Sequence, residues 1–139
     1  MEFVDSNVLI YAYDASAGSR YDRAKSLVKR LGSGPEGAVS VQVLQEFYVN
    51  VVGKIEQRLT PEDARGVVRT LSRWPVHSPG AADVLEATVI AEENTISFWD
   101  AMIVRSAAQL GCTTLWSEDL NDGQTIAGIT VRNPFGAHG

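Results

Sequence analysis

The chain has 139 residues, of which 45% are hydrophobic and 21% are charged, a composition typical of one globular domain. One cysteine and two histidines exclude both a disulfide framework and a zinc site built from Cys and His side chains. No apolar segment approaches the roughly 18 residues of a membrane span, and no basic leader opens the chain, so we expect a cytoplasmic protein with a single domain, residues 1–139.

The charge is unevenly distributed along the chain. A net charge of −5 argues against a generally basic surface for nucleic acid. Residues 20–73, however, hold ten basic residues against six acids, whereas the rest of the chain holds two against eleven. Within that basic stretch, Arg65, Arg69 and Arg73 recur every four residues, which predicts a stripe on one helix. This division fits a basic rim beside an acidic pocket, and solvated helix faces alone would also produce it.

Short apolar segments alternate with segments of helical periodicity, which predicts an α/β domain with a mostly parallel sheet of about five short strands. The expected strands are residues 3–4, 38–39, 76–77, 113–116 and 129–132, the last at an edge. The expected helices are residues 7–13, 19–31, 41–55, 61–73, 78–92 and 97–110. Ser19, Thr60 and Ser97 are expected to cap three of these helices at their N-termini.

The segment 32–37, with the sequence GSGPEG, matches the glycine pattern of a dinucleotide-binding loop. That loop works only between a strand and a following helix, and here the predicted order is the reverse. Pro35 and the anionic Glu36 are also unsuited to holding a phosphate. We therefore exclude a dinucleotide site, and the chain contains no P-loop, nucleophile-elbow or zincin motif.

Two acidic residues occupy positions that favour a site. Asp5 follows the first strand, at the edge where open parallel sheets bind ligands, although Asp is also a good helix cap. Asp100 shares the apolar face of its helix with Ile103 and Val104, so its carboxylate needs a partner, for which a cation is the natural choice. The alternative is a capping box with Ser97.

Two further acids are less distinctive. On a helical wheel, Glu46 falls opposite the apolar stripe of segment 41–55. This position, taken by itself, predicts a solvated side chain. Asp119 lies in a polar turn after strand 113–116, where the pattern does not separate it from Glu118 or Asp122. Carboxylates gathered at one sheet edge repel one another unless a cation neutralises them. Oxygen ligands favour Mg²⁺ or Mn²⁺, and such ions serve phosphodiester hydrolysis.

These acids occur in four short segments, followed by NPF at 133–135: VDSNVL at 4–9, VLQEF at 43–47, FWDA at 98–101 and LWSEDL at 115–120. In this order and spacing, the chain resembles PIN-domain nucleases, in particular VapC-type toxins of toxin–antitoxin pairs. The resemblance implies a PIN-like three-layer sandwich. It also implies a catalytic and metal-binding quartet with two supporting polar residues, namely Asp5, Glu46, Asp100 and Asp119, supported by Asn7 and Ser117.

The function that the resemblance implies is a divalent-metal-dependent endoribonuclease. It would cleave RNA phosphodiester bonds with a water activated by Mg²⁺ or Mn²⁺, form a homodimer, and be inhibited by a cognate antitoxin that lies across the active-site groove. On charge alone, Arg65, Arg69 and Arg73, or the basic segment 20–30, are candidates for holding the flanking phosphates.

Three other functions stay open at this point. A PIN-like enzyme without an antitoxin would process RNA or cut structured DNA. A non-enzymatic interaction module would use all its acids as helix caps. A signalling receiver would need a lysine late in the chain, and the last lysine is Lys54.

Overall fold

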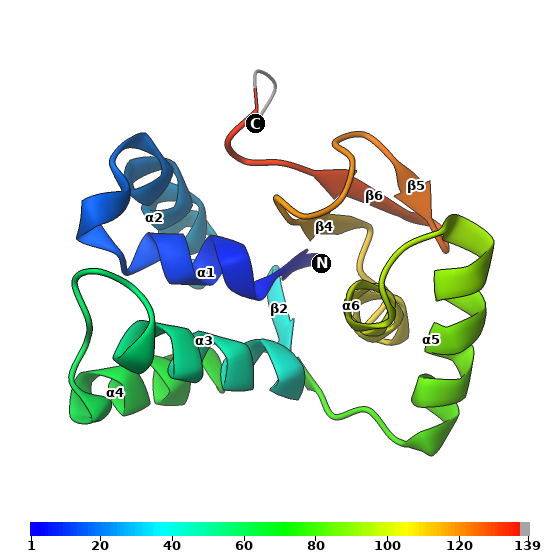
Figure 1. The fold of residues 1–139 in the computed structure, drawn as a ribbon, viewed down its shortest axis with the longest axis horizontal. Coiled ribbons are helices and arrows are strands. Elements are labelled where there is room, and N and C mark those ends of the chain that lie inside the picture. Colours follow the sequence, from blue (N-terminus) through cyan, green and yellow to red (C-terminus); the bar gives the residue numbers. More distant parts are fainter. Residues whose placement is uncertain (137–139) are drawn as a thin grey trace.

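The computed structural model describes residues 1–136 and shows one six-stranded sheet (Figure 1). The strands are β1 (Glu2–Val4), β2 (Gly37–Ser40), β3 (Val76–His77), β4 (Thr114–Trp116), β5 (Thr125–Ile126) and β6 (Ile129–Arg132). Their order is β3-β2-β1-β4-β6-β5, and every pair is parallel except β5 with β6. The predicted α/β class with a mostly parallel sheet is confirmed. That one domain includes all of residues 1–139 stays a prediction, since residues 137–139 lie outside the described part.

Six α-helices and one 3₁₀ helix occur within the described part of the chain. They are α1 (Ser6–Ala12), η1 (Ala15–Ala17), α2 (Ser19–Gly32), α3 (Val41–Gly53), α4 (Pro61–Leu71), α5 (Ala81–Asn94) and α6 (Phe98–Gln109). Within residues 1–136, none of them has the length and hydropathy of a membrane-spanning helix.

Two of the three predicted N-caps are confirmed. The Thr60 hydroxyl accepts a hydrogen bond from the Asp63 backbone N–H at 3.1 Å, and the Ser97 hydroxyl accepts one from Asp100 at 3.0 Å. The prediction for Ser19 is wrong. Gly18, with φ of +64°, occupies the capping position of α2 and offers no side chain to cap it, so Ser19 is the first helical residue.

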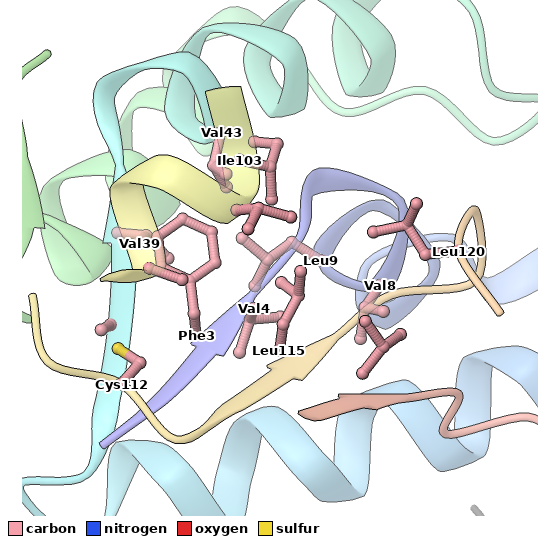
Figure 2. Packing of buried hydrophobic residues seen from close by; sticks show 14 of the residues in the cluster. Phe3, Val4, Val8, Leu9, Val39, Val43, Ile103, Cys112, Leu115 and Leu120 are labelled. Carbon is pink, nitrogen blue, oxygen red and sulfur yellow. The ribbon is translucent and has the colours of Figure 1, made fainter. Parts of the chain in front are cut away.

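Helices cover both faces of the sheet, as the predicted three-layer sandwich requires. Phe3 and Val4 are consecutive in β1, so their side chains point to opposite faces, and both are fully buried. Figure 2 shows α2 and α6 on opposite sides of β1 and β4. Burial of every position in a central strand is typical of parallel sheets, because helices pack on each side.

In the core, side chains of α1 pack directly against those of the central strands. Val8 and Leu9 of α1 pack with Leu115 of β4 and Ile103 of α6 in one fully or nearly fully buried cluster (Figure 2). Only Asp5 separates the end of β1 from the start of α1. Packing on both sides therefore fixes this acid at the carboxyl edge of the sheet.

The C-terminal end of the sheet differs from the prediction. Residues 129–132 do form a strand, β6, but it lies inside the sheet, and the unpredicted β5 forms the edge. β5 has only two residues, too few to show an alternating pattern. A two-residue turn, Ala127 and Gly128 with φ of +50° and +80°, joins β5 to β6, in keeping with the tight turns that match strand twist.

The strand order creates a switch point beside β1. The chain passes from β1 to β2 and β3 on one side and then returns to β4 on the other side. In open α/β sheets, ligands bind outside the carboxyl ends of strands at such a point. The residues that follow these two ends are Asp5 after β1 and Ser117 to Asp119 after β4.

The glycine-rich segment 32–37 connects α2 to β2, so the helix-then-strand order is confirmed. Gly37 is buried, and a Cβ atom there would lie 2.8 Å from the indole ring of Trp74. Close packing of an aromatic ring on the strand therefore explains the last glycine of this segment, without any phosphate.

We predict that Gly37→Ala destabilises the fold by about 1–3 kcal/mol, because Trp74 or the strand must shift to admit the methyl group. Urea denaturation measures the change. Gly34→Ala is the matched control in the same segment, since its Cβ would meet nothing within 4 Å. Equal stability of the two variants would show that the Trp74 contact is not restrictive.

Candidate metal centre

Three carboxylates from distant parts of the sequence meet at the switch point. Asp5, Asp100 and Asp119 each present a carboxylate oxygen, and these three oxygens all lie within 4.8 Å of one another. They come from the end of β1, the first turn of α6 and the loop after β4. The sheet topology thus brings together three of the four acids that the sequence selected.

Asp5 is the buried member of the group, with 3% of its surface exposed. Its carboxylate accepts hydrogen bonds from the Ser6 backbone N–H at 2.7 Å and from the Ser117 hydroxyl at 2.8 Å. Removal from water raises the pKa of Asp5 to about 7 despite these bonds, and the charges of Asp119 and Glu46 add to the rise. Asp5 therefore caps α1 and also belongs to the acidic cluster.

Asp100 is half-buried and Asp119 is exposed. Burial raises the pKa of Asp100, and the nearby charge of Asp119 raises it further. Ser97 caps α6, because its hydroxyl accepts from the Asp100 backbone N–H, whereas the Asp100 carboxylate reaches the other two acids.

Glu46 lies beside the cluster. Burial raises the pKa of Glu46, and the charges of Asp100 and Asp119 raise it further. Its Oε1 atom is buried and has no hydrogen-bond partner within residues 1–136. A buried carboxylate oxygen without a donor is unfavourable unless a ligand completes it.

The helical wheel of α3 predicted a solvated Glu46, and this prediction is wrong. The buried stripe of α3 consists of Val43, Phe47 and Val51, whereas Leu44 and Tyr48 line an outer hollow against α4. The predicted apolar stripe contained Leu44, Tyr48, Val51 and Ile55, so it was centred on the side of the helix that lines this hollow and not on the side that faces the core. Glu46 is one turn from Val43 and adjoins the stripe that really faces the core.

The two predicted supporting residues hold the loop after β4. Ser117 is fully buried, and its hydroxyl donates to Asp5 and accepts from the Asp119 backbone N–H at 3.2 Å. The Asn7 Oδ1 atom accepts from the Glu118 backbone N–H at 3.3 Å. Its Nδ2 atom is buried without a partner within residues 1–136.

The same loop contains two other acids, and both are engaged elsewhere. Glu118 forms an ion pair with Arg20 at 2.7 Å and accepts from the Tyr11 hydroxyl at 3.2 Å. The Asp122 carboxylate accepts from the Asn133 backbone N–H at 3.0 Å. Asp119 is thus the acid of this loop that joins the cluster, a distinction that the residue pattern could not make.

The candidate phosphate-binding arginines do not form one stripe. Arg65 and Arg69 line the hollow of about 530 Å³ between α3 and α4, together with apolar residues. α4 ends at Leu71, so Arg73 lies beyond it and lines a different hollow. In segment 20–30, Arg20 and Arg30 form ion pairs with Glu118 and Glu2.

A hard divalent cation fits the donor set. Every candidate ligand atom is a carboxylate oxygen, which suits Mg²⁺ or Mn²⁺ and not softer metals. The like charges within 4.8 Å and the unpaired Oε1 atom of Glu46 both call for a positive charge between them.

One part of the site was missed by the sequence analysis. Asp100 and Asp119 line a hollow of about 320 Å³, together with five neutral polar residues, Asn94, Thr95, Ser97, Asn121 and Gln124. No periodicity marks these residues, because they lie at helix ends and in the loop before β5. Thr95 has φ of +52°, a conformation that the letters of the sequence do not indicate.

The cluster of acids at the switch point of a three-layer α/β sheet makes this chain an α/β domain with a candidate metal-binding site. The sequence profile of the PIN domain matches residues 3–121. The chain belongs to the PIN-domain family.

Solved structures with the same fold come from toxin–antitoxin systems. A toxin–antitoxin complex from Klebsiella pneumoniae is 22% identical, with a TM-score of 0.69 over 97% of this chain and 98% of that chain. DNA-bound VapBC from Salmonella typhimurium is 19% identical, with a TM-score of 0.65 over 96% and 97%. VapC20 from Mycobacterium tuberculosis, described as a sarcin-ricin loop cleaving toxin, is 19% identical, with a TM-score of 0.61 over 86% and 90%. No curated protein sequence matches this chain.

We predict that the metal-free protein loses stability through Asp5 as the pH rises from about 4 to about 7. The pKa of Asp5 is raised from 3.8 to about 7, so the folded state keeps a proton that the unfolded chain releases. This contribution is complete below the unfolded pKa and is lost as the pH passes the folded one. Urea denaturation across this pH range, with and without Mn²⁺, measures it.

Asp5→Asn should remove this pH-dependent contribution, roughly 2–4 kcal/mol, and should be as stable as the native chain or slightly more stable without metal at pH 8. Mn²⁺ should raise the melting temperature of the native chain and hardly that of this variant. Glu86→Gln, an exposed site on α5, is the control and should behave as the native chain. An Asp5→Asn protein that still gains stability from Mn²⁺ would contradict the assignment.

Proposed function

We propose that this chain is a divalent-metal-dependent endoribonuclease that acts in the cytoplasm as the toxin of a toxin–antitoxin pair. The observation that carries the proposal is the convergence of Asp5, Asp100 and Asp119 within 4.8 Å, with the unpaired Oε1 atom of Glu46 beside them. Membership of the PIN-domain family supports the nuclease activity. The fold neighbours support the biological role and the substrate, since one is a toxin–antitoxin complex and another is described as a sarcin-ricin loop cleaving toxin.

In this proposal the chain holds the ion and the water in fixed positions. Asp5, Asp100 and Asp119 would hold Mg²⁺ or Mn²⁺, and the bound ion would supply the charge that polarises the scissile phosphate and activates a water. Ser117 keeps the Asp5 carboxylate in place through its 2.8 Å hydrogen bond. Glu46 Oε1, which has no hydrogen-bond partner within residues 1–136, would accept a hydrogen bond from the attacking water and orient it.

Asp5→Asn, Asp100→Asn and Asp119→Asn should each lower the rate of RNA cleavage by about 100-fold or more, since each removes a charged ligand of the ion. The assay is purified protein with RNA and Mn²⁺, with EDTA abolishing cleavage by the native chain. Asp122→Asn is the control, because Asp122 belongs to the same loop and binds the Asn133 backbone instead of the cluster. Cleavage that survives EDTA would contradict the metal-dependent mechanism.

The same assay separates the alternative functions. Cleavage of structured DNA in preference to RNA would favour the structure-selective nuclease. Absence of cleavage of either substrate, with an intact fold, would favour a non-enzymatic interaction module. RNA cleavage that no partner protein inhibits would favour an RNA-processing enzyme over a toxin.

A homodimer is part of the proposal, supported by an apolar face on α5. Val84, Leu85 and Val89 are 42%, 69% and 45% exposed, and apolar side chains gathered on a helix favour burial against a partner. Leu85→Glu should therefore shift the native mass from dimer to monomer without unfolding the chain. Light scattering after size exclusion measures the mass, and a dimer that persists in this variant would place the interface elsewhere.

A further inference from the structure

The hollow beside the metal centre has the shape and chemistry of a binding site. It measures about 320 Å³ and is bounded by the end of α5, the start of α6 and the loop between β4 and β5. Figure 1 shows the carboxyl end of α5 next to β5, which closes this corner of the molecule. Asp100 and Asp119 belong to the lining of the hollow, so the hollow adjoins the proposed metal ligands.

The side chains that line the hollow do not suit the binding of another phosphate group beside the scissile one. The only charged residues of the lining are the two carboxylates Asp100 and Asp119, and the lining includes neither lysine nor arginine. A phosphate needs positive charge or several backbone N–H donors, and the acids would repel it without an ion. The part of the hollow away from the acids therefore suits an uncharged, polar group.

Neutral side chains able to both donate and accept hydrogen bonds form the wall. Asn121 and Gln124 each present a carboxamide, and no hydrogen bond within residues 1–136 engages either side-chain amide. Asn94 uses its Nδ2 atom on the Ile90 carbonyl at 2.9 Å, which leaves its Oδ1 atom as an acceptor. Carboxamides recognise the edge of a nucleobase because they match a neighbouring donor and acceptor on the ring.

Two apolar side chains complete the hollow. Leu120 is 8% exposed and Ile96 is half-buried, and both pack against the core of the domain. The apolar surface that these two side chains expose is small beside the polar wall, so it contacts part of a planar heterocycle while the polar side chains bind the edge of the ring.

A strained residue holds this wall in place. Thr95 ends α5 with φ of +52° and ψ of +50°, a left-handed conformation that is unfavourable for a β-branched residue. Strain of this kind persists only where the surrounding structure imposes it. Here it turns the chain sharply, so that residues 94–97 run along the hollow before Ser97 caps α6.

We propose that this hollow binds the nucleobase adjacent to the scissile phosphate, and that Asn121 and Gln124 make cleavage selective for the base at that one position. The inference rests on the proposed ribonuclease function and adds the part of the substrate that the protein recognises. The divalent ion held by the acids would anchor the scissile phosphate, and the base attached through the neighbouring ribose would extend into the hollow.

The experiment is sequencing of the products from a randomised single-stranded RNA cut by the native chain and by Asn121→Ala, Gln124→Ala and the double variant. The native chain should prefer one base by about tenfold or more at one position next to the cut. The double variant should lower that preference below about threefold, with an overall cleavage rate within about tenfold of the native rate. Gln109→Ala, which removes an exposed amide of α6 outside the hollow, should leave the preference unchanged.

The outcomes separate this inference from the function on which it rests. An unchanged base preference in the double variant, or a native chain that cuts without preference, would overturn the nucleobase site while the ribonuclease function stands. A double variant that keeps its base preference and instead cuts DNA as readily as RNA would show that the hollow binds the ribose. If Mn²⁺ raises the melting temperature of the native chain but the chain cuts no RNA, both the proposed function and the nucleobase site are wrong.

Discussion

The structure depends on a buried carboxylate, Asp5, that the fold places beside other carboxylates. Removal from water raises the pKa of Asp5 to about 7, and the charges of Asp119 and Glu46 add to the rise. A chain selected for stability alone would place a neutral side chain at this position. The native fold tolerates the charges because a large apolar core on both sides of β1 outweighs them, and because a bound cation would neutralise them.

The strand order places these acids together at the edge of the sheet where a ligand can bind. β1 and β4 are neighbours in the sheet although more than a hundred residues separate them in the chain, and the chain departs from their carboxyl ends in different directions. The loop after β4 is held by its own hydrogen bonds. Ser117 links it to Asp5, and Glu118 binds Arg20 and Tyr11, so Asp119 is presented to the cluster without a long flexible segment.

Most of the fold could be predicted from the sequence because its elements carry strong local signals. Thr60 and Ser97 cap their helices as their spacing indicates, and the central strands contain short apolar pairs such as Phe3-Val4 and Ala38-Val39. The two-residue strand β5 and the glycine cap of α2 could not be predicted, since neither has a periodic pattern or a capping side chain. These features depend on packing between elements.

The site was predictable to a lesser degree, and for different reasons at different residues. Asp5 was indicated by its position after a strand, and Asp100 by the helical face that it shares with apolar residues. Glu46 needed the family resemblance, because two faces of α3 are apolar and the sequence does not show which of them meets the core. The neutral wall formed by Asn121 and Gln124 gave no signal, since its residues acquire a common function only when α5 ends beside the loop before β5.

Asp5 is the single residue between β1 and α1, so no loop separates the strand from the helix at the centre of the molecule. Val4 is paired in the sheet and Ser6 already belongs to the helix, so the backbone on each side of the acid is fixed. Lengthening or shortening the chain here by one residue would displace either the strand register or the helix, and with it the carboxylate. In the course of evolution, this junction is therefore closed to insertion and deletion, whereas the segment between α3 and α4 has room for both.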